Sequence, residues 1–431
     1  MAISPARHVA FSVLMRVQEQ DAYASDLLQS QLTSLSPEDR GLAHEIVMGV
    51  LRWRSRLDAE IALHSFTPIR KLDAAVLTSL RMAVFQLRYL ERVPGHAIVH
   101  DAVDQVKAAG KTSAAGLVNA VLRKVGTAKL VPKPETIAER YAHPEWLVER
   151  WIAHYGEETV RAICEFDQQP PPTFIRVRRG VDEDEVLKSL VDDGIAFEAS
   201  PVVLRCYHVT AGDVLRSHAW QHEQIAIQDE GSQLVAQIAS AIGGEPRRVL
   251  DCCAAPGGKT MMLAEAHPNA TVIAVELHEH RATALRKRCS TANVEVVHAD
   301  IAQYQSTDDF DLVLADVPCS GTGTLARNPE IKWRLQASDV AELAARQTAI
   351  LKAAIGLAKS GAIVVYSTCS LEPEESEEVF EQAAQEASCE IVSLPELVNP
   401  GARALARGPY LRTLPSIQQC DGFFIAALRK R

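Results

Sequence analysis

Several features that would mark a secreted, membrane-spanning or zinc-binding protein are missing from this sequence of 431 residues. It contains no long uncharged apolar run of the kind that a membrane span needs. The first apolar patch, residues 9–17, contains Arg16 and no small-residue cleavage site follows it, so we expect no secretory signal. The nine cysteines are odd in number and form no CxxC pair, which argues against a disulfide framework and a zinc ribbon. We therefore expect a cytoplasmic protein without a metal site.

An excess of positive charge, which is typical of a simple nucleic-acid binder, is also lacking, because the net charge is −10. The charge is unevenly spread. Residues 1–144 hold 18 Lys and Arg against 14 Asp and Glu, a net of +4, whereas the remainder holds 27 against 41, a net of −14. A mildly basic front and an acidic rear suit RNA contacts made by the front, although two ordinary solvated surfaces would explain the same charges.

The spacing of apolar residues predicts three domains. In residues 1–144 it follows the three-and-four pattern of amphipathic helices, and Ser36 followed by Pro37 is typical of a helix start. Residues 145–227 mix strand-like and helix-like segments, which predicts a small α+β connector of the kind found in RNA-recognition domains. In residues 228–431 strands alternate with helices, which implies a parallel sheet covered on both faces. The expected fold class is an all-α domain, an α+β connector and a C-terminal α/β Rossmann-like domain.

The positions of the expected elements fix which residues follow a strand. Strands are predicted at 173–177, 248–251, 271–276, 294–297, 310–316, 362–367 and 423–428, with an extended run at 197–204 and helices at 184–191 and 339–358. In open α/β sheets ligands bind beyond the carboxyl ends of the strands, so residues at those ends are the first candidates for a site.

The first candidate is the run from Asp251 to Thr260, which follows a predicted strand and opens a predicted helix. Its small residues would let the backbone approach a ligand closely. Its Gly-Lys-Thr end is typical of a phosphate-binding P-loop, but that motif needs glycine where Cys253 stands. The dinucleotide pattern GxGxxG is absent as well. The remaining interpretation is a nucleoside pocket of the S-adenosylmethionine type.

Acidic residues at the next two strand ends support that interpretation. Glu276 ends the second strand, where a carboxylate can accept both hydroxyls of a ribose. Asp300 follows the third strand and could reach an adenine amino group. A single acid in such a place is often only a helix cap, but three in succession, counting Asp251, weaken that explanation.

Two cysteines also follow predicted strands. Cys319 lies in the run Asp-Val-Pro-Cys-Ser-Gly that begins at Asp316, and Cys369 lies in the run Tyr-Ser-Thr-Cys-Ser. A lone cysteine is more often a small buried apolar residue than a nucleophile, but two in Ser- and Gly-rich turns at one sheet edge favour catalysis. A thiolate that adds to carbon 6 of cytosine makes carbon 5 nucleophilic, and an acid such as Asp316 would assist by protonating ring nitrogen 3. A second cysteine can help to release the adduct, and spacing alone does not say which thiol attacks.

These runs, together with Pro-Glu-Glu after the second cysteine, resemble the Nol/Nop/Sun family of RNA cytosine-C5 methyltransferases. The helical front resembles NusB, an antitermination RNA-binding domain, at residues 39–52, 80–90 and 116–125. The resemblance implies that Cys369 attacks, that Cys319 releases the product, and that Lys259 and Asp316 serve the reacting centre. It implies an S-adenosylmethionine site made by Cys253, Ala254, Ala255, Pro256, Gly257, Gly258, Lys259, Glu276, Arg281, Asp300 and Asp316. The sequence departs from the family at Glu276, where Asp is commoner, and at Ser376, where Asn is usual.

The combination resembles the bacterial members of the family that methylate 16S rRNA, and it implies a monomer that acts before subunit assembly and binds neither DNA nor membrane. Two basic clusters are candidates for phosphate contacts, although a solvated helix face or strand edge would explain them equally well. Their residues are Arg52, Arg54, Arg56, Arg176 and Arg178. The alternatives are the same chemistry on tRNA or another RNA, and a non-catalytic RNA-binding or antitermination factor.

Overall fold

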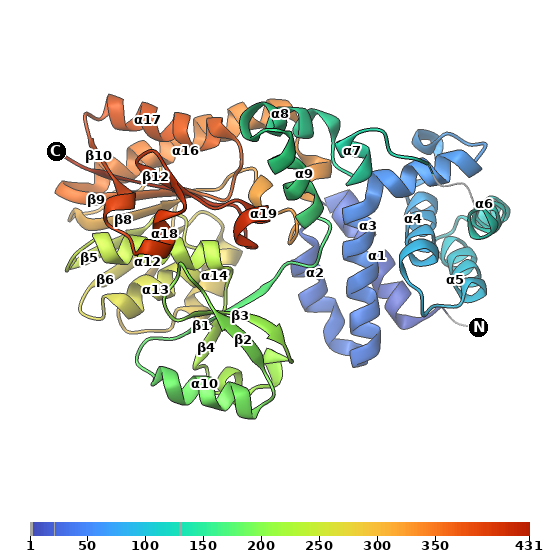
Figure 1. Cartoon of the computed structure of the whole chain (residues 1–431), viewed down its shortest axis with the longest axis horizontal. Coiled ribbons are helices and arrows are strands. Elements are labelled where there is room, and N and C mark those ends of the chain that lie inside the picture. Colours follow the sequence, from blue (N-terminus) through green and yellow to red (C-terminus); the bar gives the residue numbers. More distant parts are fainter. Residues whose placement is uncertain (1–2, 21, 129–131) are drawn as a thin grey trace. The chain divides into compact units, whose positions relative to one another are not determined.

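The computed structural model describes residues 3–20, 22–128 and 132–431, and it divides the chain into two compact units. Unit 1 comprises the described part of Met1–Pro170 together with Leu325–Arg334, and unit 2 comprises Pro171–Thr324 and Leu335–Arg431 (Figure 1). Among the helices of the described residues, none is both long and apolar enough to cross a membrane.

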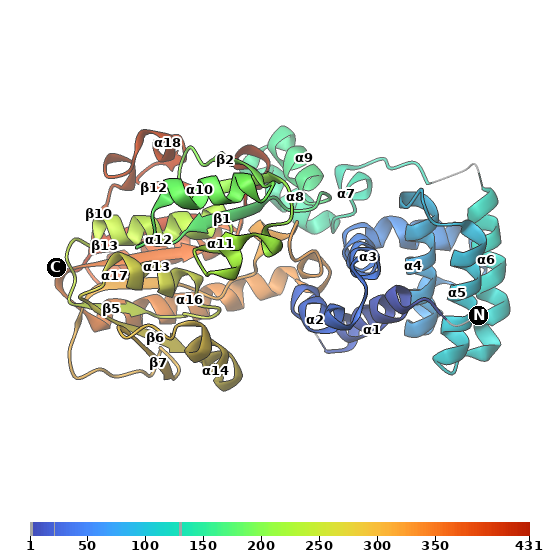
Figure 2. The same cartoon turned by 90° about the horizontal axis from the view of Figure 1, so that it is seen from below.

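Unit 1 is helical. Its longest helix, α3, begins after Ser36, whose side chain accepts a hydrogen bond from the Asp39 backbone N–H, and Pro37 occupies the first turn as expected. Helices α4, α5 and α6 pack side by side beyond it (Figure 2). The helices are α1 (Pro5–Gln20), α2 (Ala24–Gln31), α3 (Pro37–His64), α4 (Ala74–Tyr89), α5 (Gly95–Ala108), α6 (Ala115–Thr127), α7 (Ile137–Arg140), α8 (Glu145–Tyr155), α9 (Glu157–Phe166) and α15 (Ile331–Arg334).

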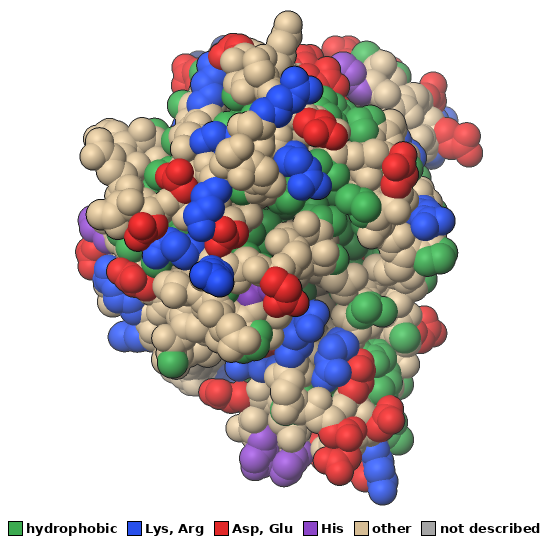
Figure 3. Space-filling model, turned by 90° about the vertical axis from the view of Figure 1, so that its left-hand side faces the viewer, with side chains coloured by type: hydrophobic (Ala, Val, Ile, Leu, Met, Phe, Trp, Pro, Cys, Tyr) green, Lys and Arg blue, Asp and Glu red, His purple; other side chains and the backbone are tan. Residues whose placement is uncertain are grey.

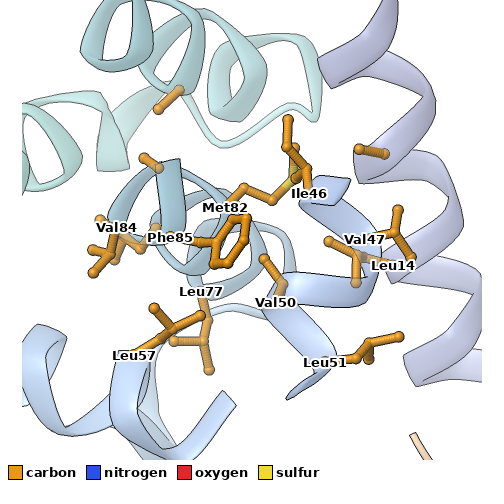
Figure 4. Packing of buried hydrophobic residues seen from close by; sticks show 14 of the residues in the cluster. Leu14, Ile46, Val47, Val50, Leu51, Leu57, Leu77, Met82, Val84 and Phe85 are labelled. Carbon is orange, nitrogen blue, oxygen red and sulfur yellow. The ribbon is translucent and has the colours of Figure 1, made fainter. Parts of the chain in front are cut away.

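The core of unit 1 forms where α3 and α4 approach each other. The Phe85 ring of α4 is 1% exposed and belongs to the same buried cluster as Val50, Leu77 and Met82 (Figure 4). Gly49 of α3 faces the same ring, and a Cβ atom added there would lie 1.9 Å from Phe85 Cζ. The absence of a side chain at this position therefore allows the two helices to pack at this distance.

The segment Leu325–Arg334, which follows the Cys319 run in sequence, is held in unit 1 by bonds to α3. The Arg52 guanidinium donates to the Ala326 carbonyl oxygen at 2.9 Å. In return, Lys332 Nζ donates to the Arg52 carbonyl at 3.1 Å, and Trp333 Nε1 donates to Leu51 at 2.6 Å. The Lys332 side chain is 1% exposed, and burial lowers its pKa.

The first part of unit 2 is a small antiparallel sheet with strand order β2-β3-β1-β4, packed with helix α10 (Figure 1). A core of Ile175, Val186, Leu190 and Ile225 joins the helix to the sheet. This is the α+β connector that the sequence predicts. Its elements are β1 (Thr173–Val177), α10 (Glu183–Asp192), β2 (Ala196–Ala199), β3 (Cys206–Ala211), α11 (His218–Gln221) and β4 (Ile225–Ile227).

The second part of unit 2 is a nine-stranded sheet in which β7-β6-β5-β8-β9 run parallel and β13 pairs antiparallel with β9. Helices α16 and α17 cover one face, and α12 and α13 cover the other (Figure 1). The elements are α12 (Glu230–Ile242), β5 (Arg248–Asp251), α13 (Gly258–Ala266), β6 (Thr271–Glu276), α14 (Glu279–Arg288), β7 (Val294–His298), β8 (Phe310–Asp316), α16 (Ala337–Leu357), β9 (Ala358–Thr368), α17 (Glu377–Glu386), β10 (Glu390–Val392), α18 (Pro400–Arg403), β11 (Ala406–Arg407), β12 (Tyr410–Arg412), α19 (Pro415–Gln418) and β13 (Phe424–Arg429).

Alternation along the central strands explains why helices cover both faces of this sheet. In β8, Leu312 and Leu314 join the core under α12 and α13, whereas Val313 joins the core under α16 and α17. Both sets are fully buried, so the strands read as continuous apolar runs. Such burial leaves the strand ends as the places where polar side chains can collect.

Candidate active site

The active-site candidates lie on loops that follow neighbouring parallel strands. Strands β5, β6, β8 and β9 end at Asp251, Glu276, Asp316 and Thr368, and β8 is adjacent to both β5 and β9. Asp316 is opposite Ser367 in the β8–β9 register. The two loops that carry Cys319 and Cys369 therefore start side by side.

The two thiols are in direct contact. Cys319 Sγ lies 3.3 Å from Cys369 Sγ, and both residues are half-buried. The hydrogen bond to Cys369 and then burial raise the pKa of the Cys319 thiol well above its ordinary value. Two thiolates at this separation would repel each other, which opposes ionisation of both thiols at once.

Lys259 connects the cofactor-loop candidate to the cysteine loops. Its Nζ lies 2.8 Å from Asp316 Oδ2, and the Ser367 hydroxyl donates to Asp316 Oδ1 at 2.7 Å. Burial opposes the charge on Lys259, but the neighbouring Asp316 carboxylate outweighs it and raises the pKa of the lysine. The ammonium also lies 4.9 Å from the centre of the Phe423 ring. Lys259 is therefore charged, and Asp316 holds it beside the loops that carry Cys319 and Cys369.

The loop between β5 and α13 depends on its glycines. Gly257 has φ of +103°, a conformation that favours glycine, and an added Cβ would lie 2.7 Å from Leu285 Cδ1. The carbonyls of Ala255 and Pro256 accept hydrogen bonds from Arg281 and Arg288 at 3.3 and 3.0 Å. This geometry presents a narrow backbone loop at the edge of the sheet.

Three further residues of this loop, Ala254, Gly258 and Cys253, are close to neighbouring parts of the domain. The Ala254 N–H donates to Val275 of β6 at 2.9 Å. At Gly258 an added Cβ would lie 3.2 Å from the Gln228 side chain. Cys253 packs against the core under α16 and α17, and burial raises the pKa of its thiol.

Asp251, at the end of β5, carries a buried carboxyl group of which only one oxygen accepts a hydrogen bond from a side chain. It is 1% exposed, and its Oδ2 accepts a hydrogen bond from the Thr260 hydroxyl at 2.7 Å. Its Oδ1 has no partner among the described residues. Burial raises the pKa of this carboxyl to about 6. A cation or hydrogen-bond donor from a ligand would satisfy the unpaired oxygen.

The other two strand-end acids have polar partners. The buried Glu276 carboxylate accepts a hydrogen bond from the His278 backbone N–H at 2.9 Å, and its Oε1 lies 3.9 Å from Arg281. Asp300 accepts from the Ala302 N–H at 3.0 Å and from Gln303 Nε2 at 3.2 Å, as a turn-capping residue would. Asp300 therefore caps a turn in this structure, and adenine binding by Asp300 stays a prediction.

The candidate RNA-binding arginines lie in different surroundings. Arg52 and Arg176 are 3% and 4% exposed, and their guanidinium groups bond to Ala326 and Glu265. Neither is open to a phosphate in this structure, and RNA contact by either stays a prediction. The face of the molecule drawn in Figure 3 mixes basic and acidic side chains.

Arg54, Arg56 and Arg178 are half-buried. Arg54 lies 5.7 Å from the centre of the Trp333 ring, and burial, followed by the nearby charge of Arg81, lowers its pKa to about 10. Arg56 donates to the Pro132 carbonyl at 3.0 Å. Any phosphate contact by Arg54 or Arg56 would compete with these existing partners.

Glu375 is a site residue to which the sequence analysis gives no role. It ends the Pro-Glu-Glu turn, is fully buried, and accepts hydrogen bonds from Ser320 and Ser370, which follow Cys319 and Cys369 in the chain. The signal available in the sequence was an acid six residues after a candidate nucleophile. Nothing in that spacing shows that its carboxylate turns back between two loops.

Comparison with protein families divides the chain in the same order as the fold. The model described as 16S rRNA methyltransferase RsmB/F matches residues 243–429, the NusB family matches residues 4–127, and a ferredoxin-like domain of RsmF/B-like methyltransferases matches residues 143–211. These matches confirm the predicted fold class. The predicted boundaries at residues 144 and 227 stay predictions, and α8 and α9 lie in unit 1.

Relatives match over almost the whole chain. A probable ribosomal RNA small subunit methyltransferase B of Bacillus subtilis is 33% identical over 100% of both chains. The ribosomal RNA small subunit methyltransferase B of Klebsiella pneumoniae is 32% identical over 99% of this chain and 98% of its own. Among solved structures, PH0851 has a TM-score of 0.84 at 24% identity over 100% of both chains. A methyltransferase homologue from Pyrococcus horikoshii has a TM-score of 0.59 at 25% identity, over 68% of this chain and 98% of its own.

Proposed function

The chain belongs to the RsmB/F family of 16S rRNA methyltransferases, and from that premise we propose that it methylates carbon 5 of a cytosine in 16S rRNA through a covalent adduct on Cys369. The observation that carries the proposal is the contact between Cys319 and Cys369, at 3.3 Å, beside the Lys259–Asp316 ion pair. A methyltransferase that attacks through nitrogen or oxygen would not need two thiols in contact.

S-adenosylmethionine is the proposed methyl donor, and it supplies an electrophilic methyl group on a positively charged sulfur. The residues at the edge of the sheet fit it. The unpaired Oδ1 of Asp251 needs a donor or a cation, and the donor carries both an ammonium and a sulfonium. The Glu276 carboxylate is proposed to bind the ribose and Asp300 the adenine, with residues 253–258 against the methionine part. Arg281, 3.9 Å from Glu276, would orient that carboxylate.

The first chemical step is attack by the Cys369 thiolate on carbon 6 of the flipped-out base. As the C–S bond forms, electron density moves toward carbon 5 and ring nitrogen 3. The proton held between Lys259 and Asp316, 2.8 Å apart, can be delivered to nitrogen 3 and prevent charge from accumulating there. Carbon 5 would then form its bond to the methyl group as the bond between that group and the donor's sulfur breaks, which leaves the donor as a neutral thioether.

Release of the product requires loss of the proton on carbon 5 and cleavage of the bond between carbon 6 and sulfur. In the free enzyme, the hydrogen bond to Cys369 is the largest cause that keeps the Cys319 thiol protonated. The contribution of Cys369 is lost once its sulfur is bonded to the base, whereas burial and the charge of Glu375 still raise the pKa of the Cys319 thiol. After its proton has passed to solvent, the Cys319 thiolate removes the proton from carbon 5. The bond between carbon 6 and sulfur then breaks with its electron pair leaving on Cys369, and nitrogen 3 returns its proton to the Lys259–Asp316 pair.

The test is denaturing gel electrophoresis of the wild type, Cys369→Ala and Cys319→Ala after incubation with S-adenosylmethionine and 16S rRNA. We expect a covalent protein–RNA band with Cys319→Ala alone, because only this variant can attack without releasing. A band with Cys369→Ala instead would exchange the two roles. Nucleoside mass spectrometry of the digested rRNA should show 5-methylcytidine with the wild type only.

The state of the RNA and the oligomeric state enter the same experiment. We propose that the substrate is rRNA before subunit assembly and that the enzyme acts as a monomer, so free 16S rRNA should be methylated faster than assembled small subunits. If the wild type modifies neither, and calorimetry shows no binding of S-adenosylmethionine, the proposal fails and a non-catalytic RNA-binding factor is the alternative. Turnover on tRNA in place of 16S rRNA would contradict the substrate assignment alone.

A further inference from the structure

Glu375 holds a buried carboxylate that lies between the two cysteine loops without touching either thiol. It ends the short 3-10 turn Pro373–Glu375 and is 0% exposed. Its Oε1 accepts hydrogen bonds from the Ser320 backbone N–H and from Gln347 Nε2, both at 2.8 Å. Its Oε2 accepts from the Ser370 hydroxyl at 2.6 Å and from the Ser320 hydroxyl. Charge-assisted bonds of this kind are about twice as strong as neutral ones.

The donors come from both sides of the candidate thiol pair. Ser320 directly follows Cys319, and Ser370 directly follows Cys369. Gln347 of α16 also donates to the carbonyl of Pro318, which directly precedes Cys319, at 3.1 Å. One carboxylate therefore connects both loops to each other and to a core helix. The Tyr366 hydroxyl in turn donates to the Glu375 carbonyl at 2.7 Å, which fixes the turn itself.

A buried carboxylate is costly unless its oxygens are fully hydrogen-bonded, and here all four donors belong to or support the cysteine loops. Apolar packing would have joined the loops without that cost, but it is less directional. The negative charge of Glu375 also raises the pKa of the Cys319 thiol, as a smaller contribution after those of Cys369 and burial.

We propose that Glu375 is a positioning residue for the two-cysteine reaction, which clamps Ser320 and Ser370 so that Cys319 stays within reach of the adduct formed on Cys369. This inference rests on the proposed function. Glu375 contacts no reacting atom, so its removal should leave the attack of Cys369 possible and should slow the release that needs both sulfurs. A displacement of about 1 Å at a reacting group can cost about 100-fold in rate.

The first readout needs no RNA. Phenylarsine oxide condenses with two thiols to form two As–S bonds and one water, so it labels Cys319 and Cys369 together only while they are close. Cys319→Ala and Cys369→Ala serve as background controls. Each lacks one thiol of the pair, so any label that it takes up comes from the other cysteines. We expect Glu375→Ala to lower labelling of the pair by at least about 10-fold, because the two loops are no longer held together. This corresponds to a change of about 1.4 kcal/mol in the equilibrium between close and separated thiols. Glu375→Gln, whose amide has the same length and can bridge both serine hydroxyls, should restore it to within about 3-fold of the wild type.

The second readout is turnover with 16S rRNA. Glu375→Ala should lower kcat by about 100-fold, leave KM for RNA unchanged, and accumulate the covalent band that the wild type does not. Glu378→Ala, an exposed acid of α17, is the matched control and should behave as the wild type. Labelling and kcat at wild-type level in folded Glu375→Ala would overturn the proposal, as would a Glu375→Gln variant as impaired as Glu375→Ala.

If Glu375→Ala does not fold, Ser370→Ala decides, because it removes only the hydroxyl that joins the Cys369 loop to the clamp. Unchanged labelling and turnover in that folded variant would overturn the proposal equally. The proposed function is tested separately. A wild type that forms no adduct and no 5-methylcytidine would refute the function, whereas dithiol labelling tests the clamp without RNA.

Discussion

Asp251→Asn should make the ligand-free protein more stable at neutral pH, although it changes a residue of the proposed cofactor site. The carboxyl is 1% exposed, and its Oδ1 has no partner among the described residues. An amide of the same size can still accept the hydrogen bond from Thr260, and it carries no charge to desolvate. The substitution therefore removes the cost of a buried charge and keeps the Thr260 hydrogen bond, and the buried amide NH2 group that it introduces costs less than the charge did.

The magnitude follows from the pKa of Asp251, which is about 6 in the folded protein against an ordinary value of 3.8. The folded state binds the proton more tightly, so stability is present while the carboxyl is protonated and is lost as the pH rises from about 4 to about 6. At about 1.4 kcal/mol for each pKa unit, the wild type loses about 3 kcal/mol by pH 7.5 relative to the amide, and about 1.5 kcal/mol at pH 5.

Urea denaturation of both proteins between pH 5 and pH 8 measures this difference directly. The advantage of Asp251→Asn in the free energy of unfolding should grow by about 1.5 kcal/mol over that range and level off above pH 7. Asp309→Asn, which removes an exposed carboxylate before β8, should show no such growth. An Asp251→Asn variant that is less stable than the wild type at pH 7.5, or a pH-independent difference, would refute the reasoning.

The affinity for the proposed donor should depend on pH in the opposite direction from the stability of the ligand-free protein. If the proposed donor places positive charge near Asp251, it favours the carboxylate, so the affinity of the wild type for S-adenosylmethionine should rise with pH through about 6. Calorimetry at pH 5.5 and pH 8 should show this rise in the wild type and a weaker, flatter profile in Asp251→Asn. Equal affinities and equal profiles would separate Asp251 from the cofactor.

Two further predictions concern unit 1. Gly49→Ala should lower the free energy of unfolding by about 1–3 kcal/mol, because the new Cβ would lie 1.9 Å from Phe85 Cζ, whereas Gly41→Ala in the same helix meets nothing within 4 Å and should raise it by about 0.5–1 kcal/mol. Thermal denaturation of the pair decides, and the same sign in both variants would contradict the packing argument. Lys332→Met should lower the free energy of unfolding by about 1–3 kcal/mol, because it leaves the buried Arg52 carbonyl without the hydrogen bond that Lys332 Nζ donates. Lys352→Met removes an exposed ion pair with Glu386 and should cost much less, so equal losses would contradict the role of burial.

The strand ends of the α/β domain were predictable because its central strands are apolar throughout. The predicted strands at 248–251, 271–276 and 310–316 coincide with β5, β6 and β8. Their ends gave Asp251, Glu276 and Asp316 without knowledge of the sheet. The sequence of a single strand does not show which strands lie next to it in the sheet. The pairing of Asp316 with Ser367 places the two cysteine loops side by side. The sequence therefore predicted two thiols at one edge, and only the register shows them in contact.

Burial of the arginines was not predictable from the local pattern. Arg52 lies among the alternating charges of α3, and nothing nearby shows that the segment Leu325–Arg334, far along the chain, supplies the carbonyl that its guanidinium binds. Arg176 similarly finds Glu265 of α13 across a long separation in sequence. The predicted extended run at 197–204 overlaps connector strand β2 and ends before β3, so β3 was not predicted.

Asp251, Glu276 and Asp316, which end β5, β6 and β8, show most clearly how surroundings divide residues that the sequence treats alike. Asp316 is paired with the Lys259 ammonium at 2.8 Å. Glu276 is buried but accepts a backbone N–H and lies within 3.9 Å of Arg281, so its charge is compensated before any ligand arrives. Asp251 is more deeply buried, has an unpaired oxygen, and has a pKa raised to about 6. Of the three, Asp251 is therefore the acid whose protonation a cationic ligand should change, and pH should affect cofactor binding chiefly through it.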